Sequence, residues 1–297
     1  MTSALRIGPE TPDPARDDAL RQAAPAWDDA LNAGKESVVC DLKSQAGLAL
    51  AQALVDGADV VLDGFRPGVL QRLGVTVPES AVRCSLTGFG SRGRHARRAG
   101  HDLNYAGWAG LLADTAPTPP PTQVADLCAG SLAALAEILA ALLERARTGR
   151  GAQLEISMTH GSHRLVAHRV AGDPIPRLLT GGLACYRVYA TSDGRYLTVG
   201  ALEPTFFARL CELLGRRDLA GLQYKADAQE RVAAALAEAF ATRPLAAWLE
   251  AFDGEDVCVG PVATIEEAAR DFGFEPAGDP PALGEHTEAW RSELALS

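Results

Sequence analysis

Between residues 37 and 89, short apolar runs alternate with segments of helical period. Residues 37–42, 58–65 and 81–89 form runs of strand length, whereas 47–57 and 67–74 carry apolar residues at helical spacing. Parallel strands need a crossover between them, and a helix is the usual crossover. We therefore predict an α/β fold built on a parallel sheet.

Ligands of such sheets bind at the carboxyl ends of the strands, which here lie near residues 41–43, 64–66 and 87–90. The loop at 87–101 combines four glycines with Arg92, Arg94, Arg97 and Arg98 in a chain whose formal net charge is −10. Glycines let a backbone approach a ligand closely, and arginines pair with phosphate. The loop pattern fits a phosphate site, and it fits a solvated loop equally well.

Residues 100–151 contain two acid–base candidates at loop-to-helix junctions. His101 follows the basic loop, and Asp126 stands where a Pro-rich spacer gives way to an apolar helix predicted over 126–147. Unpaired N–H groups in a first helical turn favour a carboxylate, and they are also donors for a developing enolate. His101 and Asp126 suit proton transfer, while a helix cap and an exposed histidine are the simpler interpretation.

The second half of the chain predicts a smaller α+β domain over 173–271, with 1–172 and 272–297 forming the larger domain. A hairpin is expected over 185–202 with its turn at Asp193 and Gly194. Helices follow from Glu203, over 230–241 and over 244–252, and 257–262 reads as a short strand. Thr264 and Glu267 form a capping box for another helix.

Composition excludes several classes of protein. The acidic balance argues against a nucleic-acid partner, and we find neither a leader nor an apolar run long enough to span a bilayer, so we expect a cytoplasmic protein. The six cysteines form no C-x-x-C pair, which favours reduced thiols over a metal site. Cys128 as a nucleophile, and His160 with His163 as a metal pair, are the weaker alternatives.

Eight ordered segments together resemble the family III CoA-transferase superfamily, and within it the α-methylacyl-CoA racemases. They span about residues 31–270 and are 31–47, 58–75, 86–90, 99–105, 125–132, 147–158, 192–204 and 258–262. The resemblance implies a large Rossmann-like domain with a smaller α+β domain, and two chains interlocked as a homodimer. It also implies an acyl-CoA substrate, with coenzyme A entering as part of that substrate and no other cofactor.

The resemblance further implies roles for individual residues. In the racemases, His101 and Asp126 would exchange the α-proton of a 2-methylacyl-CoA and Glu203 would support the site. In the transferases, the aspartate at position 126 would be a nucleophile, and the histidine found here at position 101 would typically be missing. The positions implied for binding CoA are Asp41, Leu42, Lys43, Gly64, Arg72 and Tyr105, to which the loop arginines Arg92 and Arg97 would add charge.

The chain also departs from the family pattern. By the resemblance it begins near the family's second strand, and an expected basic residue is replaced at Gly8-Pro9. Residues 181–186 read G-G-L-A-C-Y where the family has G-G-A-P-Y-Y. These departures leave two alternatives to a racemase: a CoA-transferase, or a non-catalytic CoA-binding partner of a full-length family member. Because His101, Asp126 and Glu203 are all present, we favour the racemase.

Overall fold

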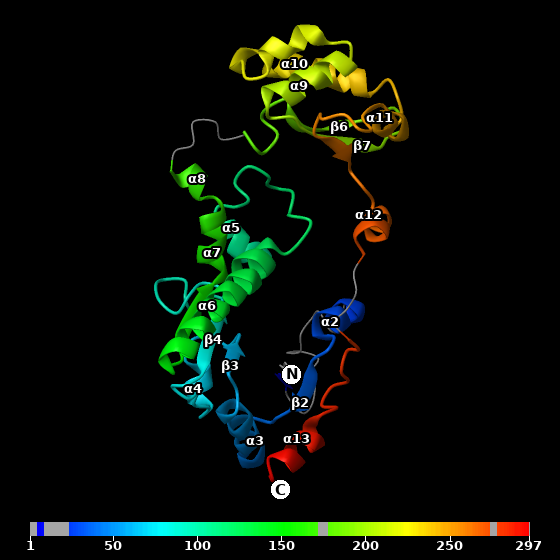
Figure 1. The fold of residues 1–297 in the computed structure, drawn as a ribbon. Helices are drawn as coiled ribbons and strands as arrows, with labels where there is room; N and C mark the ends of the chain where they lie inside the picture. Colours follow the sequence, from blue (N-terminus) through cyan, green and yellow to red (C-terminus); the bar gives the residue numbers. More distant parts are fainter. Residues whose placement is uncertain (1–4, 9–23, 172–177, 274–277, 297) are drawn as a thin grey trace. The chain divides into compact units, whose positions relative to one another are not determined.

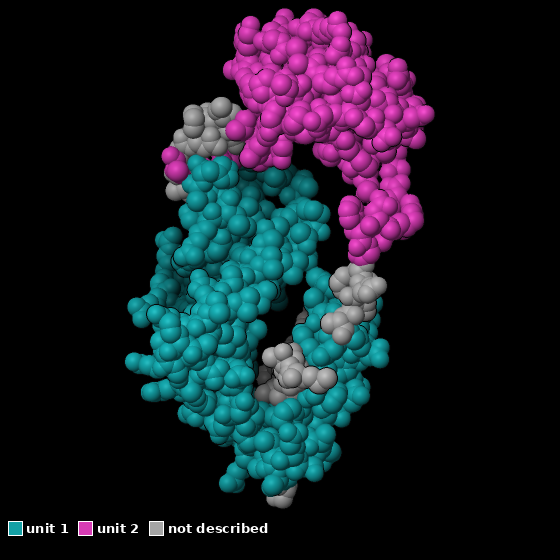
Figure 2. Space-filling view, viewed as in Figure 1, with its two compact units in different colours: residues 1–168, 275–297 teal, residues 169–274 magenta. Residues whose placement is uncertain are grey.

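A computed structural model describes residues 5–8, 24–171, 178–273 and 278–296. The chain forms two compact units, residues 1–168 with 275–297 and residues 169–274, which Figure 2 colours separately. The sequence placed the domain limits at 172 and 272, near the ends of these units. Residues 172 and 173 themselves lie outside the described part, as does Pro9. Each unit is described by itself below.

The strands of unit 1 are parallel, as predicted, but they form two sheets rather than one. β1 (Leu5–Gly8) pairs with β2 (Glu36–Val39), and β3 (Val60–Asp63), β4 (Val82–Thr87) and β5 (Gln153–Ser157) form the second sheet in that order. The free edge of β2 is closed by side chains: the Ser37 N–H donates to His286 Nδ1 at 3.2 Å, and the Val39 N–H to Thr287 Oγ1 at 3.0 Å. With those donors used, β2 does not pair with β3.

Helices cover both sheets of unit 1 (Figure 1). α2 (Pro25–Asn32), α3 (Gln45–Asp56) and α13 (Thr287–Glu293) accompany the first sheet, and α4 (Val69–Arg72) follows β3. α5 (Asp102–Trp108), α6 (Ala133–Thr148) and α7 (Met158–Leu165) accompany the second sheet. The short α8 (Ala167–Val170) follows α7 at the boundary of the unit. The crossover helices are where the sequence predicts them, because the apolar periodicity that defines them also defines their buried faces.

The long helix begins differently from the prediction. Residues Ala125–Leu132 form a π-helix, η1, and only then does the α-helix α6 start. Tight packing on α7 accompanies this wider turn: a Cβ at Gly161 would lie 2.6 Å from the Ala129 carbonyl oxygen, and one at Gly130 would lie 3.0 Å from Met158 Cγ. π-helical turns are rare and are frequent at functional sites.

Together η1 and α6 make one 24-residue helix, Ala125–Thr148, that is apolar enough to cross a membrane by length and composition. The expectation that no run in the chain reaches that length was therefore wrong. Glu137 interrupts the apolar run in the sequence, but one charged residue lowers the mean hydropathy of the helix only a little. Only 17% of the most apolar 18-residue window is buried, so the helix presents most of that window at the surface of unit 1.

Unit 2 contains the predicted hairpin and a third strand. β6 (Tyr186–Ala190) and β7 (Tyr196–Gly200) are antiparallel, and β8 (Val259–Pro261) pairs with β7. α9 (Pro204–Leu213), α10 (Gln229–Phe240) and α11 (Leu245–Ala251) surround a core in which Phe207, Phe240 and Leu236 are fully buried. Two 3₁₀ turns, Arg217–Leu222 and Ala226–Ala228, connect α9 to α10.

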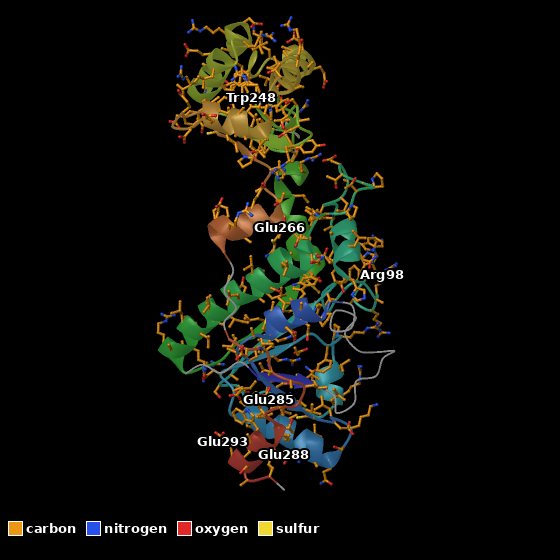
Figure 3. All side chains as sticks on the ribbon, turned by 90° about the vertical axis from the view of Figure 1, so that its right-hand side faces the viewer. Arg98, Trp248, Glu266, Glu285, Glu288 and Glu293 are labelled. Carbon is orange, nitrogen blue, oxygen red and sulfur yellow. The ribbon has the colours of Figure 1, made fainter. Side chains whose placement is uncertain are left out.

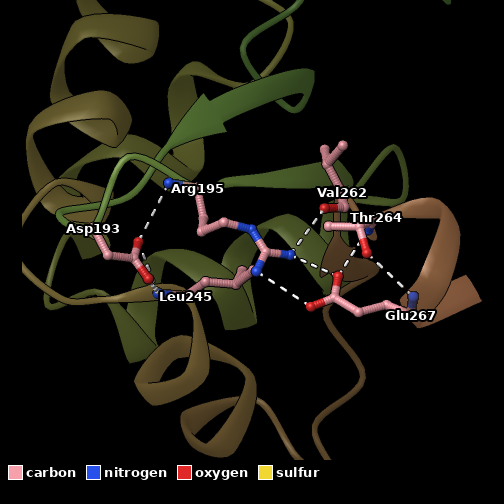
Figure 4. A network of polar contacts seen from close by, with 6 residues as sticks. All are labelled: Asp193, Arg195, Leu245, Val262, Thr264 and Glu267. Carbon is pink, nitrogen blue, oxygen red and sulfur yellow. Dashed lines mark hydrogen bonds and ion pairs between the residues drawn. The ribbon is translucent and has the colours of Figure 1, made fainter.

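A polar network fixes the hairpin turn and the last helix of unit 2, α12 (Ile265–Phe272), as Figure 4 shows. Asp193 accepts from the Leu245 N–H, and Arg195 binds both carboxylate oxygens of Glu267 at 2.7 and 3.2 Å. Thr264 and Glu267 form the predicted capping box. The turn at Asp193 and the capping box at Thr264, both predicted from the sequence, therefore take part in the network that joins the hairpin turn to α12.

Candidate active site

α5 places His101 at its N-terminus, directly after the basic loop. The side chain is exposed, and its backbone N–H donates to Asn104 Oδ1 at 3.1 Å, which fixes the turn that starts the helix. Below it lies a small core of Phe89, Tyr105, Ala106 and Ala125. His101 is thus an open acid–base group on a supported junction.

Asp126 lies in the first turn of η1, one residue after the fully buried Ala125. Its N–H donates to Asp102 Oδ1 at 2.9 Å, so the junction that carries His101 and the junction that carries Asp126 are bonded to each other. Burial raises the pKa of the half-buried Asp126 carboxyl, the negative charge of Asp102 raises it further, and the charge of His101 lowers it. The bond between the two junctions thus holds the two predicted proton-transfer groups in one region of unit 1, where the charge of one acts on the pKa of the other.

Two N–H groups at the start of this helix, where we expect donors for an enolate, are already bonded within the chain. The Asp126 N–H donates to Asp102 and the Leu127 N–H donates to the Gln123 carbonyl at 2.9 Å. The helix start is satisfied from within the chain because Asp102, unlike a ligand, is permanently held beside it.

Tyr105 has a structural place that its predicted role did not anticipate. Its ring fills the space beside two glycines, since a Cβ at Gly88 would lie 2.3 Å from the ring and one at Gly100 would lie 2.9 Å away. Its hydroxyl donates to the Gly100 carbonyl. Burial raises the pKa of Tyr105, the charge of Asp126 raises it further, and that of Arg66 lowers it. Tyr105 therefore joins the basic loop to the Asp126 junction, and its contact with CoA stays a prediction.

A cavity of about 240 Å³ lies along the second sheet and its β3 end. Its polar wall is a cluster from β3 and β4, in which the Asp63 carboxylate accepts from Arg83 at 3.2 Å and from the Ser85 hydroxyl at 2.9 Å. Arg66, Phe65 and Ser91 also line it. Two of the three strand ends at which the topology predicts ligands contribute to this cavity.

The basic loop is anchored at both ends and keeps two free arginines. Ser91 bonds Glu155 through its N–H and hydroxyl at 2.5 Å each, and Arg98 lies over the Trp108 ring at 5.1 Å, beside α5 in Figure 3. Arg94 donates to His95, whose ring is 4.4 Å from that of Trp108. Arg92 and Arg97 make no hydrogen bond or ion pair within the described ranges, which leaves them available for an anion.

The other predicted binding residues are spread over unit 1. Gly64 is exposed in the loop before α4, and Arg72 is exposed as the last residue of α4, next to the cavity-lining Gln71. Asp41, Leu42 and Lys43 form the turn after β2, where Asp41 Oδ1 accepts the Lys43 N–H at 3.0 Å, so they belong to the first sheet. Among described residues, no strand bond joins that sheet to the second one.

Glu203 belongs to unit 2, where it is exposed at the start of α9. Its charge raises the pKa of Cys258 and of Tyr224, in each case after the larger effect of burial. Gln223, which is buried, donates to the Ala201 and Leu202 carbonyls just before Glu203, at 3.0 and 2.8 Å. The segment that carries Glu203 is thereby fixed within unit 2.

The weaker candidates behave as ordinary side chains. His160 Nδ1 shares a hydrogen bond with the Ser157 hydroxyl at 2.7 Å, and His163 Nδ1 with the Ala109 carbonyl at 2.9 Å. No group of three metal-ligating side chains occurs among the residues that the structure describes. Cys128 and Cys258 are exposed and the other four cysteines are buried.

Two features of the site were missed from the sequence. Asp102 has no role in the predicted site, although an acidic residue at the first position of a helix is a signal for an anionic contact to N–H groups. One residue in the sequence points to the π-helical start of the long helix: Gly130, which lies where α7 approaches closely.

Residues 5–287 match the family model described as CoA-transferase family III. This chain belongs to CoA-transferase family III. The predicted family and its α/β fold are therefore confirmed. The chain is 36% identical over 260 residues to α-methylacyl-CoA racemase of Mus musculus, an alignment that covers 80% of this chain and 68% of that protein. It is 32% identical over 265 residues to acetyl-CoA:oxalate CoA-transferase of Acetobacter aceti, with coverage of 81% and 68%.

Solved structures agree on the fold. A CaiB/BaiF family protein from Brucella suis superposes with a TM-score of 0.78 at 25% sequence identity, covering 98% of this chain and 92% of that one. A protein from Mycobacterium tuberculosis superposes equally well, at 24% identity and with coverage of 97% and 91%. The relatives named above include a racemase and a transferase, so the residues of this chain distinguish between the two reactions.

Proposed function

We propose that this family III protein racemises 2-methylacyl-CoA thioesters by two-base exchange of the α-proton. The observation that carries the proposal is the pair of junctions, one with His101 and one with Asp126, held together by the bond from the Asp126 N–H to Asp102. A raised pKa suits a carboxyl that has to accept a proton in one direction and return it in the other.

In the proposed reaction, one of the two groups removes the proton from the α-carbon. The C–H electron pair moves into the C–C bond as the thioester carbonyl becomes an enolate. The second group then delivers a proton to the opposite face, and the electron pair returns to form the new C–H bond. Because His101 and Asp126 differ, they exchange roles when the direction of the reaction changes.

Racemase relatives at 36% and 35% identity support this choice, together with the presence of His101. Arg92 and Arg97, which are free for an anion, fit the phosphates of coenzyme A, and the cavity beside Arg66 fits part of the same ligand. No metal or redox cofactor is needed for this proton exchange. We propose a cytoplasmic protein, in keeping with its composition.

The test is entry of deuterium at the α-carbon of a 2-methylacyl-CoA in deuterated water, followed together with loss of chirality. We expect both in the unaltered protein and a loss of at least about 100-fold in His101→Ala and Asp126→Ala, since a positioned acid–base group contributes about 10²–10⁴-fold. His168→Ala, which removes another exposed histidine of unit 1, should change neither rate. Absence of exchange in folded protein would refute the proposal. Glu203→Gln tests the supporting role proposed for Glu203.

A CoA-transferase is the second candidate, favoured by the similarity to the oxalate enzyme. There the Asp126 carboxylate would attack the thioester carbonyl, the C–S bond would break, and a mixed anhydride and CoA thiolate would form. An assay with an acyl-CoA donor and a free carboxylic acid acceptor separates the two reactions. A non-catalytic partner of a full-length family member would show neither activity alone.

We also propose a homodimer. Leu132, Leu135, Leu139 and Leu143 form one stripe along η1 and α6, with exposed fractions between 52% and 76%. Their three- and four-residue spacing is that of a helix seam that packs on a partner helix. Light scattering should give twice the mass of one chain, and Leu139→Glu should halve it. A monomer in both cases would refute the dimer.

A further inference from the structure

Asp102 has no role in the proposed proton transfer, although it contacts the residue that follows Ala125 in η1. It is the first residue of α5, it is half-buried, and its Oδ1 accepts the Asp126 N–H across 24 positions of sequence. A carboxylate that accepts a backbone N–H makes a charge-assisted bond, stronger than a neutral one. The bond fixes the start of η1 against the start of α5.

Among the residues that the structure describes, Asp102 is the acidic group whose charge raises the pKa of Asp126. His101 and Tyr105 face Asp126 from α5, and Arg66 acts on Tyr105 from the loop after β3. On β5 and α7, Glu155 bonds Ser91, and His160 and His163 bond Ser157 and Ala109. On α6, Arg145 bonds Asp59 and Arg147 bonds Glu144. Arg164 on α7 and Glu137 on α6 are exposed.

We propose that the Asp102 carboxylate is a positioning residue, which holds Asp126 in place by accepting its N–H and sets the charge state in which Asp126 works. The geometric part follows from the bond, because no other described group receives the Asp126 N–H. The electrostatic part follows because two carboxylates in one small site cannot both carry charge without cost. The expected effect on turnover rests on the proposed function, whereas the hydrogen bond and the charge effect do not.

Two substitutions separate the two parts. Asp102→Asn removes the charge but keeps an oxygen that can accept the N–H, whereas Asp102→Ala removes both. We expect Asp102→Asn to move the titration of Asp126 to lower pH while the Asp126 amide stays protected from hydrogen exchange. Asp102→Ala should also remove that protection and lower kcat, by up to about 100-fold if the carboxylate shifts by an ångström. Glu79→Gln, which removes an exposed charge of unit 1, is the matched control.

The primary readout is the carboxyl carbon signal of Asp126, followed by NMR in ¹³C-labelled full-length protein and assigned by its loss in Asp126→Asn. The pH profile of α-proton exchange is the second readout. A titration of Asp126 that is unchanged in Asp102→Asn, with amide protection unchanged in Asp102→Ala, would overturn the proposal. If the titration moves but no acyl-CoA exchanges its proton, Asp102 stands as the positioning residue and the racemase assignment fails. If Asp102→Ala does not fold, Asp102→Asn decides.

Discussion

Replacing Gln229 by leucine should destabilise unit 2 far more than its size suggests. The side chain is buried at the start of α10, where Oε1 accepts the Ala184 N–H at 2.9 Å and Nε2 donates to the carbonyls of Gln223 and Lys225 at 2.9 and 3.0 Å. Leucine has a similar volume and no polar atom. The substitution therefore removes three hydrogen bonds without opening a cavity.

The magnitude follows from which groups lose their partner. The Lys225 carbonyl also receives the Ala228 N–H, so two buried groups are left unsatisfied, the Ala184 N–H and the Gln223 carbonyl. Each costs about 1–3 kcal/mol. Burying leucine in place of an amide returns about 1 kcal/mol. We expect the free energy of unfolding of unit 2 to fall by about 3 kcal/mol, which at a urea dependence of about 1.5 kcal/mol per molar lowers the midpoint by about 2 M.

Trp248 provides the assay, because it is the one tryptophan of unit 2 and is buried in its core. Trp27, Trp108 and Trp290 belong to unit 1 and would be replaced by phenylalanine, so that fluorescence follows unit 2 alone. Glu230→Gln, at the exposed neighbouring position, is the control. A midpoint that moves by less than about 0.3 M in Gln229→Leu would refute the reasoning, since that is within the uncertainty of extrapolated stabilities.

Three further predictions concern both units. Asp126→Asn should stabilise the protein at neutral pH: the folded-state pKa is raised, so stability falls as pH rises from the ordinary value through the raised one, and the gain should vanish in urea titrations below the ordinary pKa. Gly161→Ala should lower the melting temperature and the exchange rate, because its Cβ would lie 2.6 Å from the Ala129 oxygen, whereas Gly107→Ala, whose nearest contact is 3.9 Å, should not. Arg195→Met should lower the melting temperature only slightly, and less in high salt, because the Arg195–Glu267 pair is a third exposed.

Local patterns predicted the elements well, and long-range pairing poorly. The Asp193-Gly194 turn and the Thr264 capping box each depend on residues within four positions, so their geometry can be read from the chain. The division into two sheets depends on His286 and Thr287 reaching β2 from about 250 residues away, which no periodicity encodes. In the site, glycine spacing indicated a close approach, but it did not reveal that Tyr105 fills that space.

His286 and Thr287 also set an order on how the chain is made. The edge of β2 stays open until residues 249 positions further along have left the ribosome. At about 5–20 residues per second, that interval lasts roughly 12–50 seconds. During this interval the second sheet and all of unit 2 are synthesised. The edge of β2 is then unpaired and can pair with another nascent chain. The last part of the chain thus protects an edge that is made first, and the slower the translation, the longer that edge stays open.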